Sequence, residues 1–191
     1  MSAVLAALDA ALQDNVSLMG TLLEQQQYDE ALQCMDERLA LIESLVQLAK
    51  SEPAILLATY FESVSEHAAL LRDLPVAGVH LDLKRAPEQL AAFLPDWPQG
   101  KVLSLGVIDG RNIWAADLDA ALAMLEQART RLGDCLWIGS SCSLQHVPVD
   151  LAQERDLDGD LLRWLAFARQ KLAEIGTLKR GLAQGREVIQ G

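Results

Sequence analysis

The chain has 191 residues, of which 51% are apolar and 23% charged, with a formal net charge of −11. This composition is typical of globular domains and excludes disorder over the whole chain. Because an acidic chain repels phosphate groups and no Lys/Arg cluster offsets its charge, we expect no nucleic-acid partner. The longest nearly apolar stretch, residues 54–61, is too short to cross a bilayer, so we expect no membrane span.

The N-terminus and the cysteines indicate the compartment. No basic region precedes the first apolar residues, and Asp9 interrupts them at once, which is unlike a secretory signal peptide. Cys34, Cys135 and Cys142 form an odd and sparse set, typical of reduced thiols. We therefore expect a cytoplasmic protein.

The composition changes sharply near Pro53. Residues 1–53 contain 2 basic and 9 acidic residues, whereas residues 54–191 contain 14 basic and 18 acidic residues and all four Trp. All six prolines lie at or after position 53. Such a shift predicts two units, 1–53 and 54–191.

The first unit is predicted to be a helical hairpin. Its apolar residues recur at alternating spacings of three and four, which places them along one stripe of each of two helices. These residues are Leu5, Leu8, Leu12, Met19 and Leu22, then Leu32, Met35, Leu39, Ile42, Val46 and Ala49. Asn15, within the first stripe, either fixes the register or faces solvent. Asp29 is the expected cap of the second helix, and two helices joined so closely should pack antiparallel.

The second unit alternates predicted strands with predicted helices. Runs rich in β-forming residues lie at 55–61, 78–83, 102–108 and 136–140, and helical stretches at 62–73, 87–94, 117–132 and 154–182. This alternation predicts an α/β fold with a parallel sheet, in which Pro87 and Asp117 mark helix starts. Four βα units form either half of a (β/α)8 barrel or a small open sheet.

Polar residues follow the predicted strands. In parallel α/β folds, functional groups gather beyond the carboxyl ends of the strands. The candidates at this rim are His80, Asp82, Asp109, Arg111, Asn112, Ser140, Ser141, Cys142 and His146. They predict either a polar ligand site or side chains that satisfy the local backbone. Gly110 favours the second reading for 109–112, because it indicates a tight turn, and a structural Arg111 would then belong to a buried charge pair.

Two catalytic readings of the same residues have little support. Cys135, Cys142 and His146 have plausible zinc-ligand types, but no fourth ligand and no Cys-x-x-Cys pair accompany them, so buried thiols are favoured. Ser140 or Ser141 with His146 and Asp150 lacks the Gly-x-Ser-x-Gly turn of a hydrolase nucleophile. The sequence also contains no Gly-x-Gly-x-x-Gly and no phosphate-loop lysine, so we expect no nucleotide site.

Several stretches together resemble the cobalamin-independent methionine synthases (MetE). They are 56–61 (LLATYF), 74–83 (LPVAGVHLDL), 103–114 (LSLGVIDGRNIW), 137–151 (WIGSSCSLQHVPVDL) and 164–171 (WLAFARQK). Their order and spacing resemble the second half of that family's N-terminal (β/α)8 barrel over residues 54–185. Residues 1–53 resemble, in pattern only, the helical hairpin of flagellar export chaperones of the FliT type.

The resemblance implies methyl transfer from a polyglutamylated methyltetrahydrofolate to homocysteine, with zinc holding the thiolate. It also implies that the zinc and homocysteine ligands belong to the family's C-terminal barrel. No catalytic or metal residue therefore carries over to this chain, and Cys142 and His146 correspond to an N-terminal-barrel motif. We expect no bound cofactor, neither zinc nor methyltetrahydrofolate.

Three hypotheses about function follow. The leading one is a fragment or chimera of the methionine synthase N-terminal domain without catalytic activity by itself. The alternatives are a methyltransferase-related domain that binds folate or works with a partner chain, and a helical-hairpin interaction module.

The predicted sheet raises the question of closure. Four parallel strands leave two unpaired edges, and we expect an open face lined by Val79, Leu81, Leu103, Leu105 and Ile138. We therefore expect a homodimer or a barrel completed by a partner. Cover by the hairpin of residues 1–53 is the alternative.

Overall fold

The computed structural model describes residues 54–154 and 157–189, together with scattered positions between 18 and 43. The chain divides into two compact units, Met1–Ala54 and Ile55–Gly191. In the first unit, described residues on both sides of Gln27 are helical. The second helix begins at Tyr28, so Asp29 is already inside it and the cap predicted there is wrong. The packing of the two helices, the two apolar stripes as sets, and Asn15 lie outside the described residues.

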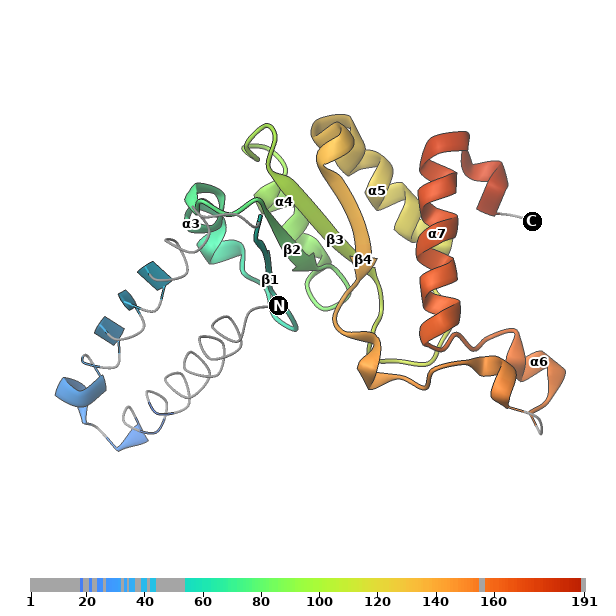
Figure 1. Ribbon diagram of the computed structural model, residues 1–191, viewed down its shortest axis with the longest axis horizontal. Coiled ribbons are helices and arrows are strands. Elements are labelled where there is room, and N and C mark those ends of the chain that lie inside the picture. Colours follow the sequence, from blue (N-terminus) through green and yellow to red (C-terminus); the bar gives the residue numbers. More distant parts are fainter. Residues whose placement is uncertain are drawn as a thin grey trace. The chain divides into compact units, whose positions relative to one another are not determined.

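The second unit contains one parallel sheet of four strands (Figure 1). The strands are β1 (Leu56–Ala58), β2 (Gly78–Asp82), β3 (Val102–Ile108) and β4 (Leu136–Ser140), in the spatial order β1-β2-β3-β4. Each strand therefore pairs with the next along the chain, as in consecutive units of a (β/α)8 barrel. The α/β fold predicted from the sequence is confirmed, and the strand order is consistent with half a barrel.

Helices follow each strand. Residues after β1 form η1 (Ser65–His67) and α3 (Ala68–Asp73), and those after β2 form η2 (Pro87–Gln89) and α4 (Leu90–Phe93). The β3–β4 connection contains α5 (Leu118–Leu132) and η3 (Gly133–Cys135). The elements after β4 are η4 (Leu144–His146), η5 (Leu151–Gln153), α6 (Gly159–Leu162), α7 (Ala168–Gln184) and η6 (Arg186–Ile189). As predicted, Pro87 opens η2 and the Asp117 carboxylate caps α5 by accepting from the Ala120 N–H at 2.9 Å.

The single long helix predicted for 154–182 is wrong. Asp158 starts a short new helix, α6, because its carboxylate accepts a hydrogen bond from the Asp160 N–H at 2.7 Å. The chain then becomes extended, and Leu165 forms an antiparallel bridge with Trp114. Helix α7 begins only after this bridge, which is a long-range contact and has no local sequence signal.

The helices cover one face of the sheet, and that face holds the core. Val79, Leu81, Leu103 and Leu105 are fully buried there, against α3, α4, α5 and α7. The expectation that they line an open face is therefore wrong. Side chains alternate along a strand, so the opposite face carries the intervening residues, aligned across the sheet as His80, Ser104 and Trp137. Among the described residues, no helix is long and apolar enough to span a membrane.

Candidate functional site

The segments that follow the carboxyl ends of the four strands form the rim on which the sequence places its candidate residues. The rim includes Asp82, Asp109, Arg111, Asn112, Ser141 and Cys142. His146 is exposed in η4 and is not among the residues that hydrogen-bond to one another there. Each of the remaining side chains has structural partners, and those partners decide what the rim can do.

Asp82 stabilises two loops. It is 1% exposed, and its carboxylate accepts hydrogen bonds from the N–H groups of Lys84 (2.9 Å), Arg85 (3.0 Å) and Phe61 (3.2 Å). Burial of a carboxylate requires such donors. Asp82 thereby connects the end of β2 to the segment after β1 and is already occupied by the backbone.

Phe61 and Arg111 form a contact that the sequence did not reveal. Phe61 has a φ of +75°, a left-handed conformation that is uncommon for a bulky residue. The Arg111 guanidinium lies 4.6 Å from the centre of the Phe61 ring. Arg111 is exposed, so its side chain does not belong to a buried charge pair as expected. The contact is an exposed cation–π pair on an unusual backbone conformation.

The turn of residues 109–112 is held by its own side chains. The Asp109 carboxylate accepts from the Arg111 N–H at 2.8 Å and from the Asn112 amide at 2.9 Å. The Asn112 side-chain oxygen Oδ1 accepts from the Trp114 N–H at 3.1 Å. These hydrogen bonds are the ones expected if the segment stabilises its own turn.

Lys171 supports this turn from α7, although nearly sixty residues separate the two in the chain. It is fully buried, and its ammonium donates to the Asn112 side-chain oxygen at 3.2 Å and to the Trp114 carbonyl at 3.0 Å. Burial lowers the pKa of Lys171, and the nearby charges of Glu174 and Asp109 oppose that shift. Sequence reasoning missed this residue because a single lysine in an amphipathic helix normally faces solvent.

Cys142 and Ser141 pack against the same turn. The Ser141 hydroxyl accepts a hydrogen bond from the Gly110 N–H at 3.2 Å. A Cβ on Gly110 would lie 2.7 Å from the Cys142 carbonyl oxygen, so only glycine fits there. Cys142 is buried, and burial raises the pKa of its thiol. The raised pKa disfavours the thiolate form that nucleophilic attack requires.

The zinc and hydrolase hypotheses do not fit this geometry. Cys135 ends η3 just before β4, whereas Cys142 follows the other end of that strand, so the two thiols cannot share a metal ion. Within the described part of the chain, no group of three or more His, Cys, Asp or Glu is placed to hold a metal. Asp150 hydrogen-bonds to Gln170 at 2.9 Å and pairs with Arg169 instead of orienting His146.

His80 lies beneath the rim, on the face of the sheet opposite the helices, which we call the inner face. Its Nδ1 is 2.9 Å from the Ser104 hydroxyl, and its ring meets Tyr60 edge-on with centroids 5.8 Å apart. His80 is 6% exposed, and burial lowers its pKa. Gly106 and Gly139, paired across β3 and β4, leave room for the imidazole. The buried ring therefore fills the inner face as a neutral side chain.

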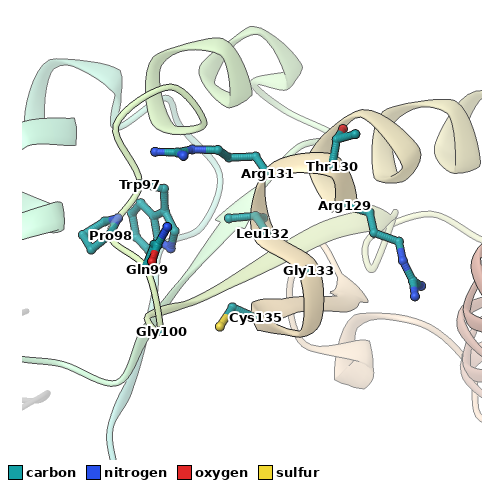
Figure 2. Close-up of a pocket in the computed structure, with 10 residues that line it drawn as sticks. All are labelled: Trp97, Pro98, Gln99, Gly100, Arg129, Thr130, Arg131, Leu132, Gly133 and Cys135. Carbon is teal, nitrogen blue, oxygen red and sulfur yellow. The ribbon is translucent and has the colours of Figure 1, made fainter.

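A hollow lies at the opposite end of the sheet, between the 97–100 loop and the end of α5 (Figure 2). Its volume is about 350 Å³. Arg131 extends across it and donates to the carbonyls of Leu94 and Pro95, while Arg129 points away. Trp97 donates to the Lys101 carbonyl at 2.8 Å. These bonds fix the loop and engage the side chains of Arg131 and Trp97 with the backbone.

Comparison with known proteins identifies the relatives. A family model described as "Cobalamin-independent synthase, N-terminal domain" matches residues 2–133. A 5-methyltetrahydropteroyltriglutamate--homocysteine methyltransferase of Acidithiobacillus ferrooxidans is 55% identical over 161 residues, which are 83% of this chain and 20% of that protein. The protein of the same name from Ralstonia pickettii is 59% identical over 143 residues, which are 75% of this chain and 18% of that protein. The chain thus spans about a fifth of the length of these relatives.

The comparison also corrects the reading of residues 1–53. The family model matches residues 2–133, which include residues 2–53, so the interpretation of this segment as a chaperone-like hairpin joined to a part of the family's barrel is wrong. Neither a flagellar-chaperone origin nor a chimera is needed to explain the change in composition. The chain belongs to the cobalamin-independent methionine synthase family, and it corresponds to part of that family's N-terminal domain.

Proposed function

We propose that this chain serves as a structural part of the N-terminal domain in a 5-methyltetrahydropteroyltriglutamate–homocysteine methyltransferase and does not catalyse methyl transfer by itself. The family membership supports the first half of this proposal. One observation carries the second half, namely that the carboxylates at the strand ends are occupied by the chain's own backbone and turn. Asp82 binds the N–H groups of residues 61, 84 and 85, and Asp109 binds within its own turn.

Methyl transfer to a thiol requires a group that activates the sulfur, and zinc would do so as a Lewis acid. The rim residues do not fit zinc. Cys142 is buried beside Gly110, His146 is exposed in η4, and among the described residues no group of three or more His, Cys, Asp or Glu is placed to hold a metal. The residues of this chain would therefore not supply a zinc site for activation of the thiol. The free thiols of Cys135 and Cys142 support a cytoplasmic location, which we also propose.

Activity and metal content test the proposal together. The purified chain, supplied with zinc, methyltetrahydropteroyltriglutamate and homocysteine, should form no methionine above background, and it should retain less than stoichiometric zinc after dialysis. The full-length Acidithiobacillus ferrooxidans relative, assayed in parallel, is the positive control. Turnover by this chain that is abolished by a chelator would overturn the proposal.

Folate binding distinguishes the proposed structural role from the main alternative, a folate-binding domain. Titration of the tryptophan fluorescence with methyltetrahydropteroyltriglutamate should give no saturable change. Saturable binding without turnover would replace the structural role with that of a folate-binding domain.

A further inference from the structure

Helix α3 ends with backbone carbonyls that the helix itself cannot satisfy. At its end the Leu74 N–H donates to the Leu70 carbonyl at 3.1 Å, as in a regular helix. The next residue is Pro75, which has no N–H for the Leu71 carbonyl, and the Val76 N–H turns to the Leu74 carbonyl at 2.8 Å. The carbonyls of the last turn therefore need a donor from elsewhere in the chain.

The side chain of Lys101 supplies this donor. Lys101 directly precedes β3, and its ammonium donates to the carbonyls of Leu71 and Arg72, each at 2.9 Å. It also donates to the Leu74 carbonyl at 2.7 Å. An ammonium group has three N–H donors, so each donor has one acceptor in this arrangement. The contact joins the end of α3 to the start of β3.

The surroundings enclose the ammonium and fix its position. Lys101 is 8% exposed, and its nitrogen lies 5.6 Å from the centre of the Trp97 ring, within the range of a cation–π contact. The Trp97 indole N–H donates to the Lys101 carbonyl at 2.8 Å, which holds the backbone from which the side chain extends. Burial lowers the pKa of Lys101, and the nearby Asp73 carboxylate opposes that shift. The three carbonyl acceptors also favour the charged form.

The arrangement of acceptors matches one class of cation. Three carbonyl oxygens around one nitrogen suit the three N–H groups of a primary ammonium. An arginine guanidinium is planar and presents its donors in a fixed fork, so it does not match this set. A quaternary ammonium has the charge but no N–H donor. The cluster therefore provides the acceptors, the enclosure and the aromatic face that a primary ammonium requires.

We propose that the carbonyls of Leu71, Arg72 and Leu74, together with the Trp97 ring, form a binding site for a primary ammonium group, which Lys101 occupies from within the chain. The site lies at the amino ends of β2 and β3, opposite the rim, and goes beyond the proposed role in the methyltransferase. A chain that lacks the Lys101 side chain should accept an alkylammonium ion from solution in its place.

Chemical rescue of Lys101→Ala tests the proposal. The atoms that this variant lacks are three carbons and the nitrogen, which are the heavy atoms of n-propylammonium. Lys101→Ala should lower the melting temperature by about 5 °C or more, because the carbonyls at the end of α3 lose their donor. n-Propylammonium chloride should restore about half of this loss or more, by an amount that grows with its concentration, because it binds the folded state. Tetramethylammonium chloride at the same concentrations should restore none of it.

Two further variants are the controls. Lys179→Ala removes an exposed lysine of α7, and its melting temperature should respond equally to the two salts, as should that of the unchanged protein. Lys101→Arg keeps the positive charge without the ammonium geometry and should also melt below the unchanged protein. Equal responses of Lys101→Ala to the two salts would overturn the proposal. A melting temperature of Lys101→Ala no lower than that of Lys179→Ala would overturn it as well.

A measurement on the unchanged protein decides the question if Lys101→Ala does not fold. In an NMR spectrum that correlates lysine Nζ with its attached protons at neutral pH, the Lys101 ammonium should give a signal that exchanges slowly with water. Correlations to the side-chain carbons of Lys101 identify this signal. Its absence would show that the carbonyls do not hold the ammonium and would overturn the proposal. Catalysis enters none of these measurements, so failure here is distinguishable from failure of the proposed function.

Discussion

The carboxylate of Asp82 and the N–H of Phe61 are 3.2 Å apart, and this bond joins the ends of two neighbouring strands. It holds Phe61 in a backbone conformation, with φ at +75°, that a phenylalanine rarely adopts. That conformation in turn sets the ring beneath the Arg111 guanidinium. Asp82, a candidate site residue by its sequence position, is thus a buried structural residue that shapes the surface of the rim.

Replacement of Asp82 should lower the free energy of unfolding more than most substitutions at the rim. Asp82→Ala leaves the N–H groups of Phe61, Lys84 and Arg85 without their common acceptor, and because these hydrogen bonds are part-buried we expect a loss of about 1–3 kcal/mol in the free energy of unfolding. Asp82→Asn retains one acceptor oxygen and should cost less. Urea unfolding followed by circular dichroism measures both, with the exposed Glu88→Ala as control. A loss for Asp82→Ala no larger than that of the control would show that the carboxylate is not structural.

Arg111→Ala should have a small effect on stability. The guanidinium is exposed and stacks on Phe61, and such contacts contribute about 0.5–1 kcal/mol. A buried charge pair would instead cost about 3–5 kcal/mol, which is the outcome expected from the sequence alone. The shift in the urea midpoint distinguishes these values. Phe61→Leu should remove the same contact. In the Phe61→Leu background, Arg111→Ala should therefore cause little further loss of stability, so the double variant should be about as stable as Phe61→Leu alone.

Acid should destabilise the protein through His80. Burial lowers the pKa of His80 below its ordinary value of 6.5, so the unfolded chain binds more protons between the folded pKa and 6.5. The free energy of unfolding should therefore rise with pH through this window and fall on acidification. In the His80→Gln variant this part of the slope should be absent, whereas His67→Gln, at an exposed position, should retain it. Equal slopes in all three proteins would contradict the neutral, buried assignment.

Two paired glycines should differ in their tolerance of alanine. A Cβ on Gly106 would lie 2.7 Å from the Ser141 Cα and 2.9 Å from the Leu81 carbonyl oxygen, so the backbone must move. We expect Gly106→Ala to cost about 1–3 kcal/mol. A Cβ on Gly139 meets nothing closer than the His80 ring at 3.4 Å, an ordinary contact, so Gly139→Ala should cost much less. Thermal unfolding of the two variants ranks them, and the reverse order would contradict the packing of the inner face.

The sequence by itself determined the order of elements and the family. Alternating β-rich and helical runs predicted the parallel sheet, and the Asp117 side chain marked the start of α5, because both signals act over a few residues. The motifs after the strands identified the family for the second unit. The composition of residues 1–53 misled, because net charge reflects exposure to solvent and not descent.

Only the tertiary structure decided how the rim is built and which face of the sheet is covered. The alternation along a strand shows which side chains share a face, but not which face the helices take, so Val79 and Leu81 were placed on the wrong side. The contacts of Lys171 with Asn112, and of Arg111 with Phe61, join residues about fifty or more positions apart. Such contacts exist only after the strands align, because parallel pairing brings the carboxyl ends of consecutive strands to one edge.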